Sequence, residues 1–508
     1  MPRSSSTAGS TAAASPTQNG RVTRPPYAVR EVGLVVAVQA ALLLALASRY
    51  GPHRDEMYFV TAGHHPAWGY PDQPALTPLL AALMDTIAPS SVVLLRLPSI
   101  LAVAGVVLLS VQAARLLGAA RAGQALTAVV VAFSALVPGL GHLMSTSTFD
   151  LLFWTAILVV VAQALVDDRP RLWLLAGVLA GVGLNNKHAV AFCLLGVLVG
   201  VALTRETRAV LRTPWPWLGG LVAAVMWAPN LLWQARHHWP VLDLSADIAD
   251  EYGGIDGRIA MVVEAFIMFS PVVGVIWVLG IVQLLRRPEW ARARVLAWAF
   301  LVVLAVFLVT GGKGYYFGGL IPPLVAAGCT HLAAARSRRG AVGLGAVCVA
   351  SSVIAYPALL PVLPASTFGH SVWADINDVQ LDTIGWPEYA DQVRAVVDSL
   401  SPQERERAVI FTSNYGEAGA MRWYDVGLPA YSGHNGFREW GPPPEDAGPV
   451  VVVHQGSPEA DFDGCVLATV LENSADAPNE EVGAGVWVCS GPAGGWASAW
   501  DDLAHYDA

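Results

Sequence analysis

Long apolar segments alternate with short polar loops over roughly the first 360 residues of the chain. A helix that crosses a bilayer needs ~17–25 mostly apolar residues, and by that length the pattern predicts about eleven such helices. The predicted spans cover residues 30–49, 92–114, 122–142, 150–166, 171–186, 188–204, 215–235, 259–285, 293–311, 315–335 and 340–359. The run 171–204 is divided because the polar residues 185–188 interrupt it, as the tip of a hairpin would.

The pattern changes beyond residue 360. A helical stretch at 387–400 precedes short β-type runs, AVIFTS, PVVVVHQ, CVLATVL and GVWVC, which is typical of a small α/β domain. The fold class predicted is an all-α polytopic membrane protein with a small C-terminal α/β domain. Its expected parts are a disordered cytoplasmic arm at 1–29, a transmembrane domain at 30–359 with a first outer loop at 50–91, and an acidic extracytoplasmic domain at 360–508.

Composition agrees with a membrane protein. Hydrophobic residues make up 54% of the chain and charged residues 14%, whereas an average soluble domain has about 25% charged residues. Mean hydropathy is +0.49, which excludes a disordered chain and argues against a soluble enzyme. The net charge of −9 hides a split, because residues 358–508 hold 5 Arg and 23 acidic residues. Nothing resembles a basic nucleic-acid-binding surface, so no nucleic-acid partner is expected.

The basic residues predict the orientation of the chain. With the N-terminus inside, eighteen Arg fall in inner segments and seven Lys or Arg fall in outer ones. Cytoplasmic loops are enriched in basic residues, so we expect a multi-pass protein of the cell membrane with a cytoplasmic N-terminus. Joining 171–204 into one span would reverse this bias. Eleven spans from an inner N-terminus leave the acidic tail outside.

Three acidic residues at the outer ends of spans are candidates for chemistry. Asp55 and Glu56 follow the first span, and Asp150 opens the fourth span after His142 and a Ser/Thr run. A solvated charged loop would also account for Asp55 and Glu56. An acid in the first turn of a helix also suits the helix dipole, which leaves a purely structural role open for Asp150.

The only two lysines give a sharper signal. Lys187 in LNNKHAV and Lys313 in GGKGYYFGGLIPP both lie at outer ends of spans, where the charge rule disfavours them. A compact ammonium suits a phosphate headgroup, although a snorkelling side chain is the alternative. Acids that could serve as a general base, combined with cations for a phosphate leaving group, indicate group transfer from a lipid-linked phosphate.

Other polar and aromatic residues add candidates without a defined motif. Arg54, Asp72, His142, Tyr315 and Tyr316 are candidate substrate-binding residues. The aromatic residues also fit an interfacial belt.

The first outer loop contains several potential metal ligands. The first-loop His and acidic residues match no standard metal spacing, so no metal site and no cofactor are predicted, with a divalent ion left open.

Cys465 and Cys489 bracket an acidic loop between two β-type runs in a tail expected outside the cell. They are predicted to form a disulfide.

These motifs together resemble a known family. The features are the acidic pair after the first span, the acid opening the fourth, Lys187, and Lys-x-x-Tyr before a Pro-rich span. The pattern resembles the GT-C class of membrane glycosyltransferases, which includes the family 39 protein O-mannosyltransferases, the aminoarabinose transferases that act on lipid A and the galacturonosyl transferases of rhizobial lipopolysaccharide. HRDEMYFVTAGHHPAWGYPDQPALTPLLA looks most like bacterial family 39 members of unassigned substrate. The resemblance covers about residues 30–335, and SNYGEAGAMRWY and YSGHNGFREWGPP look like the C-terminal domain of the same subgroup.

The resemblance implies inverting transfer of a sugar from a polyprenyl-phosphate donor to an envelope glycan, glycolipid or protein acceptor on the outer face of the membrane. By analogy, Asp55 would deprotonate the acceptor hydroxyl, Glu56 would complete the acidic pair, and Asp150 would orient the acceptor or the base. Lys187 and Lys313 would hold the donor phosphate. The chain lacks the large insert of the protein mannosyltransferases, which puts a protein acceptor in doubt.

Two other classes compete with this interpretation. A secondary transporter would place ionisable groups near the bilayer midplane in repeated halves, but Glu264 is the only acid well inside a predicted span. A non-catalytic envelope assembly protein would use the tail to recruit partners.

Overall fold

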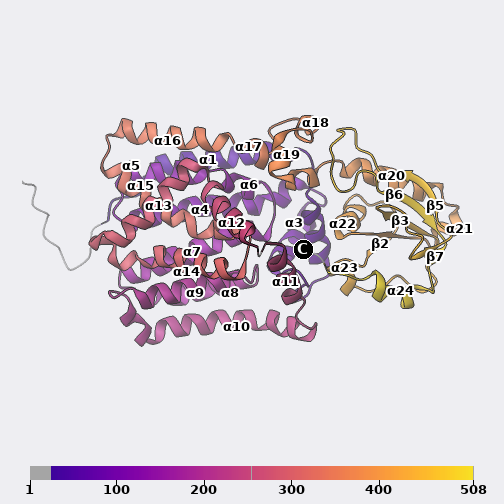
Figure 1. Ribbon diagram of the computed structural model, residues 1–508, viewed down its shortest axis with the longest axis horizontal. Coiled ribbons are helices and arrows are strands. Elements are labelled where there is room, and N and C mark those ends of the chain that lie inside the picture. Colours follow the sequence, from indigo (N-terminus) through magenta and orange to yellow (C-terminus); the bar gives the residue numbers. More distant parts are fainter. Residues whose placement is uncertain (1–23, 253, 507–508) are drawn as a thin grey trace, which may run out of the picture.

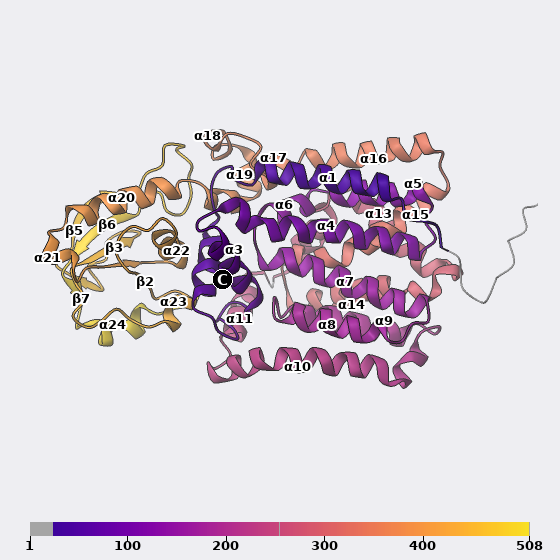
Figure 2. The same cartoon turned by 180° about the vertical axis from the view of Figure 1, so that it is seen from behind.

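The computed structural model describes residues 24–252 and 254–506, so most of the predicted arm 1–29 lies outside the described residues. Helices run side by side along the long axis of a helical body, and a sheet-containing domain lies at one end of that body (Figure 1; Figure 2 from behind). The body consists of α1 (Val29–Leu46), α4 (Val92–Leu116), α5 (Arg121–Ala132), α6 (Leu136–His142), α7 (Thr146–Val166), α8 (Leu172–Leu184), α9 (Val190–Leu203), α10 (Pro214–Arg236), α12 (Ile255–Ile267), α13 (Pro271–Arg286), α14 (Val295–Thr310), α15 (Ile321–Ala334) and α16 (Arg338–Val353).

Every predicted span coincides with a helix or a pair of consecutive helices, and the predicted fold class is confirmed. Among the described residues, length and hydropathy single out four helices that could each cross a membrane alone: α1, α4, α7 and the segment Gly314–Ala334. Counting two bent pairs as one span each gives six. Shorter apolar helices such as α8, α9 and α14 account for most of the other predicted spans.

Two predicted spans are broken rather than straight. The chain bends by 93° between α12 and α13 and by 56° between α5 and α6. The two breaks face each other: the amides of Ala135 and Leu136 donate to the carbonyls of Phe269 and Met268 at 3.2 and 3.0 Å. Backbone groups without a helical partner must find another inside a membrane, so each break supplies the partners that the other lacks. The sequence predicts one span over residues 259–285, and the structure breaks this segment just before Pro271, a residue that signals such a break.

Short elements connect the body at its two ends. At the end next to the C-terminal domain lie α2 (Arg54–His64), α3 (Leu76–Ile87), α11 (Pro240–Tyr252), η3 (Gly314–Leu320), α17 (Tyr356–Leu359), α18 (Ala365–Phe368), α19 (Val372–Ile376) and η4 (Asp378–Thr383). Two 3-10 segments, η1 (Arg208–Arg212) and η2 (Pro288–Ala293), precede α10 and α14. The first outer loop is thus largely helical.

The C-terminal domain contains the predicted α/β elements. Its strands are β1 (Val409–Thr412), β2 (Ala430–Ser432), β3 (Val450–His454), β4 (Phe462–Asp463), β5 (Val466–Val470), β6 (Gly485–Cys489) and β7 (Gly491–Pro492). Its helices are α20 (Trp386–Ser399), α21 (Pro402–Arg405), α22 (Tyr415–Trp423), α23 (Gly436–Glu439) and α24 (Trp496–Leu503).

The main sheet has the order β2-β1-β3-β6-β5, in which β1 is parallel to β2 and β3 while β6 is antiparallel to β3 and β5. The predicted disulfide between Cys465 and Cys489 is present and ties the start of β5 to the end of β6.

The first outer loop fixes the C-terminal domain to the helical body. Met57 of α2 is buried in the same cluster as Tyr389 of α20 and Val451 of β3, so a residue of the loop completes the core of the domain. In a second cluster, Tyr58 packs with Phe437 of α23. Burial of such side chains contributes roughly 1.5–3 kcal/mol each, so α2 is held from both sides.

Candidate functional site

The start of α2 presents the first-loop acids. The amide of His53 donates to Glu56 Oε2 at 2.8 Å, and the amide of Asp55 donates to His53 Nδ1 at 3.1 Å, which together form a capping box. This cap fixes the first turn of the helix, so the two acids leave the helix in defined directions. Asp55 points to the C-terminal domain, whereas Glu56 points into the body.

Asp55 is reachable and is held by the C-terminal domain. Its side chain is 37% exposed, and the hydroxyl of Tyr415 in α22 donates to Asp55 Oδ1 at 2.8 Å. The second carboxylate oxygen lies 3.8 Å from His53 Nδ1. A carboxylate with one oriented oxygen and some solvent access is the geometry that a general base requires.

Glu56 is held differently, because its carboxylate is completely buried. Arg96 Nη2 donates to Glu56 Oε2 at 2.7 Å, and neither side chain has any exposed surface. Arg96 Nε and the amide of Met144 also donate to Glu56 Oε1, at 2.9 and 2.8 Å. His142 Nε2 lies 3.2 Å from Arg96 Nη1 in the same network. Glu56 and His142 thus belong to one buried network around Arg96. The catalytic role predicted for Glu56 and the substrate-binding role predicted for His142 stay predictions.

Lys187 lies in the loop between α8 and α9, against two aromatic rings from η3. Its Nζ donates to Ser147 Oγ at 3.1 Å. The ammonium lies 5.4 Å from the ring centroid of Tyr315 and 5.1 Å from that of Tyr316. Cation–π contacts of this kind orient an ammonium without neutralising it.

The surroundings of Lys187 favour an anion. Burial lowers the pKa of Lys187, and the charge of Lys313 lowers it further, while Asp150 raises it. The Tyr315 and Tyr316 rings that contact Lys187 belong to the same loop as Lys313. Asp150 is itself buried and accepts a hydrogen bond at 2.7 Å from Trp154 Nε1. A lysine ammonium held in this way can bind a phosphate.

A further acid supports the Lys313 loop. Glu264 of α12 accepts a hydrogen bond from the amide of Gly314 at 2.8 Å. A Cβ added to Gly314 would lie 2.4 Å from Glu264 Oε2, so this approach requires glycine. The bend between α12 and α13 brings Glu264 to this position, and a straight helix over 259–285 would not predict it.

Asp72 connects the first loop to the C-terminal domain. The hydroxyl of Tyr58 donates to Asp72 Oδ1 at 3.0 Å and accepts from the amide of Gly436 at 3.1 Å. Burial raises the pKa of Asp72 to about 7, and the nearby charge of Asp55 adds to the rise. The rings of Tyr58 and Tyr415 lie 4.8 Å apart, so the partners of the two acids touch.

Arg54 belongs to the attachment of the domain. Its guanidinium forms an ion pair with Glu480 and lies 5.0 Å from the centroid of the Tyr415 ring. It therefore helps to hold Tyr415, the hydrogen-bond donor to Asp55. The predicted substrate contact of Arg54 is untested.

Most of the predicted residues therefore meet at one end of the body. Lys187 contacts Tyr315 and Tyr316 of the Lys313 loop. Asn186, next to Lys187, accepts a hydrogen bond at 2.6 Å from Thr77 of the first outer loop, which also bears Asp55. Among the described residues, no group of three or more His, Cys, Asp or Glu side chains is placed to hold a metal ion. Whether the protein needs a metal is untested.

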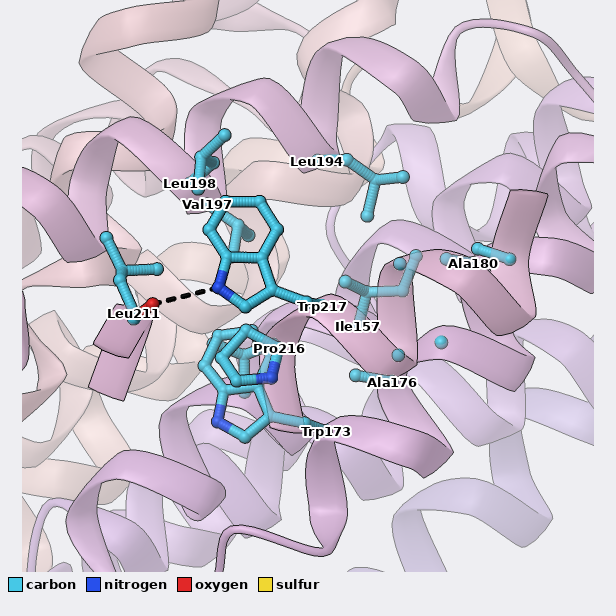
Figure 3. Close-up of a pocket in the computed structure, with 15 residues that line it drawn as sticks. Ile157, Trp173, Ala176, Ala180, Leu194, Val197, Leu198, Leu211, Pro216 and Trp217 are labelled. Atoms are coloured by element: carbon cyan, nitrogen blue, oxygen red, sulfur yellow. Dashed lines mark hydrogen bonds between the residues drawn. The ribbon is translucent and has the colours of Figure 1, made fainter. Parts of the chain in front are cut away.

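A separate cavity of about 180 Å³ lies among α7, α8, α9 and α10. Trp173 and Trp217 face each other across it, and Trp217 Nε1 donates to the carbonyl of Leu211 at 2.8 Å (Figure 3). Its lining contains no ionisable side chain, so the acid–base residues lie elsewhere.

Sequence reasoning missed the residues that support the site from a distance. Tyr415 follows Asp55 by 360 positions, and nothing in a single sequence links the two. Tyr58 stands three residues after Asp55, and this spacing places both on neighbouring turns of one helix, which was an available signal. Arg96 is one of the seven basic residues that the sequence places in outer segments. An Arg near the end of a span, next to a loop that contains Glu, suggests a buried ion pair.

Comparison with known proteins agrees with the fold. Residues 72–233 match the family described as dolichyl-phosphate-mannose-protein mannosyltransferase. No curated protein sequence was found to match the chain. The crystal structure of ArnT from Cupriavidus metallidurans bound to undecaprenyl phosphate is similar, with a TM-score of 0.60, 14% identity and coverage of 91% of this chain and 98% of ArnT. The apo structure of the same ArnT gives a TM-score of 0.57 at 14% identity, with the same coverage of both chains.

The chain thus shares a sequence segment with the mannosyltransferase family and its overall fold with ArnT. These findings confirm the predicted resemblance: the chain has the fold of the GT-C membrane glycosyltransferases, and its residues 72–233 match the dolichyl-phosphate-mannose-protein mannosyltransferase family.

Proposed function

We propose that this protein is an inverting membrane glycosyltransferase that moves a sugar from a polyprenyl-phosphate donor to a hydroxyl of a cell-envelope acceptor. The observation that carries the proposal is that Lys187 lies against Tyr315 and Tyr316 of the Lys313 loop, beside the first outer loop that bears Asp55, at one end of a GT-C fold. ArnT, which shares the fold, was solved with undecaprenyl phosphate, and this supports a lipid phosphate as the anion between the lysines.

The reaction follows from these positions. The acceptor hydroxyl attacks the anomeric carbon of the donor sugar while Asp55 takes its proton. The bond from the anomeric carbon to the phosphate oxygen breaks, and polyprenyl phosphate leaves with the electron pair. Lys187 and Lys313 stabilise the charge that develops on the leaving phosphate, and a well-placed donor of this kind contributes roughly 3–4 kcal/mol to the barrier reduction. Attack opposite the leaving group inverts the anomeric configuration.

The location of the reaction follows from the charge bias. With basic residues inside, the site and the C-terminal domain face outward at the cell membrane. The disulfide between Cys465 and Cys489 supports this orientation, because such bonds persist in oxidising compartments. The acceptor is an envelope glycan, glycolipid or protein.

The test is a reconstituted reaction. The protein in nanodiscs is given purified polyprenyl-phosphate sugars and an extract of envelope glycans and lipids, and the release of polyprenyl phosphate and the labelled products are followed by mass spectrometry. We expect release of lipid phosphate coupled to a new glycosidic bond. Movement of an intact donor across a vesicle membrane without cleavage would identify a transporter and refute the proposal.

A further inference from the structure

A cleft with a volume of about 440 Å³ lies where the first outer loop, the end of α10 and the C-terminal domain meet. Its walls come from residues 64–67, Gly69 and Tyr70, from Trp233 and His237, and from Glu439 and Trp440. The volume is within the range of small-molecule sites, about 300–1,000 Å³.

Two stacked pairs of aromatic rings line the cleft. His65 stacks on Trp440, with ring centroids 4.3 Å apart and planes inclined by 14°. On the wall formed by α10, Trp233 stacks on His237 at 3.9 Å and 16°. The face of an aromatic ring carries partial negative charge, and the C–H groups of a sugar ring carry a small positive charge. Two such walls therefore suit the C–H faces of a pyranose or furanose ring.

Polar groups at the edges of the cleft can bind hydroxyls. Glu439 lies 3.8 Å from His237 Nε2, and Arg422 Nη1 lies 3.0 Å from His65 Nε2 at the rim. Burial and the charge of Arg422 lower the pKa of His65, which disfavours the charged form of this imidazole. Donors and acceptors are present with one acid and one Arg, a balance that favours a neutral polyol over a phosphorylated or strongly basic ligand.

The cleft is joined to the reactive acids by a short series of contacts. Trp440 packs against Phe437 with ring centroids 4.6 Å apart, and Phe437 packs against Tyr58 at 6.2 Å. Tyr58 in turn donates to Asp72 and lies against Tyr415, the donor to Asp55. A molecule seated in the cleft would thus lie beside the loop that carries both acids, and not beside Lys187.

We propose that this cleft binds a neutral sugar ring of the acceptor, so that the acceptor is a glycan or glycolipid and the C-terminal domain supplies part of its binding site. The inference rests on the proposed function, because the bound sugar is an acceptor only if the protein transfers sugars. The binding itself requires no donor. It also gives the C-terminal domain a function beyond support of α2.

The test measures binding directly. Saturation-transfer NMR with the full-length protein in nanodiscs uses four probes: methyl disaccharides of glucose, galactose, mannose and arabinose. We expect at least one to bind the wild type, and Trp440→Ala to weaken that probe about fivefold to tenfold, since one stacking surface is lost. Trp440→Phe should restore most of the binding. Trp233→Ala tests the wall formed by α10 independently, should Trp440→Ala fold poorly.

The matched control is Trp217→Ala, which removes a 59% exposed Trp near the start of α10, in the separate apolar cavity. It should leave probe binding and sugar transfer unchanged. Failure of all four probes to bind the wild type, or binding by both wall variants as tight as by the wild type, would overturn the inference. So would binding of a Ser/Thr-rich peptide that Trp440→Ala abolishes while the sugars do not bind, because the acceptor would then be a protein. Since no donor is present, failure of the transfer reaction would leave these outcomes unaffected.

Discussion

Substitution of Glu56 separates a structural acid from a catalytic one. The carboxylate of Glu56 accepts five hydrogen bonds, three from Arg96 and one each from the amides of His53 and Met144. Glu56→Gln keeps the shape and one acceptor oxygen but leaves the Arg96 charge without its partner, and Arg96 has no exposed surface.

The expected cost follows from that burial. Breaking a buried ion pair on one side destabilises a protein by about 3–5 kcal/mol, because the remaining charge has lost both water and its counterion. We therefore expect Glu56→Gln to lower the free energy of unfolding by about 3–5 kcal/mol, measured in mixed dodecyl maltoside–SDS micelles. The fraction that stays folded should keep sugar transfer within about tenfold of the wild type, because the Glu56 side chain has no exposed surface with which to contact a substrate. The double variant Glu56→Gln/Arg96→Met should recover most of the stability, since the unpaired charge is removed as well.

The opposite pattern would refute this reasoning. If Glu56→Gln folds as well as the wild type but transfers no sugar, Glu56 acts in the reaction and the buried pair is not what holds the loop. Equal stability of the single and double variants would likewise show that the unpaired Arg96 charge does not destabilise the fold. Specific activity per folded molecule, measured by size-exclusion chromatography before each assay, keeps stability and catalysis apart.

Four other outcomes are expected. Lys187→Ala should weaken donor binding and transfer together, with partial rescue by Lys187→Arg; an unchanged Kd for the lipid donor would remove it from the phosphate site. The pKa of Asp72 is raised from 3.8 to about 7, so the wild type should lose up to roughly 4 kcal/mol relative to Asp72→Asn as pH rises from about 4 to about 7; parallel unfolding curves at pH 5 and pH 8 would contradict this. The double variant Cys465→Ser/Cys489→Ser should lower the free energy of unfolding by roughly 3 kcal/mol for a loop of this length. An unchanged unfolding midpoint would show that the bond is dispensable. Ser474→Cys should be labelled by an impermeant maleimide on intact cells, whereas labelling only after permeabilisation would reverse the topology.

The sequence predicted the helical body well because the bilayer imposes a simple rule. Apolar runs of sufficient length mark spans, and each of the eleven predicted spans coincides with a helix or helix pair. The two bends were missed because the rule reads composition and not backbone geometry. At the sharper bend, Ser270 has a φ of 113° and caps the helix that begins at Pro271. The neighbouring carbonyls still accept hydrogen bonds in this conformation, because the facing break supplies their donors.

The site was predicted in part, and the reason lies in where its supports come from. Lys187 and Lys313 stood out because the chain otherwise uses Arg, and in the structure Lys187 contacts Tyr315 and Tyr316 of the Lys313 loop. The pair Asp55 and Glu56 could not be divided from the sequence, since adjacent acids look alike. Their roles separate only when Arg96 is found beneath one and Tyr415 of the C-terminal domain beside the other.

Turnover of Asp55→Asn tests the central claim most directly. Asp55 is the acid that is both reachable and oriented by Tyr415, and asparagine keeps its shape while removing the base. In the reconstituted reaction with a purified polyprenyl-phosphate sugar, the account predicts that turnover falls by about 10²–10⁴-fold, while the unfolding midpoint and the Kd for the donor stay at wild-type values. Turnover within a few-fold of the wild type would contradict the account, because no other first-loop acid in the described part of the chain combines exposure with this hydrogen bond.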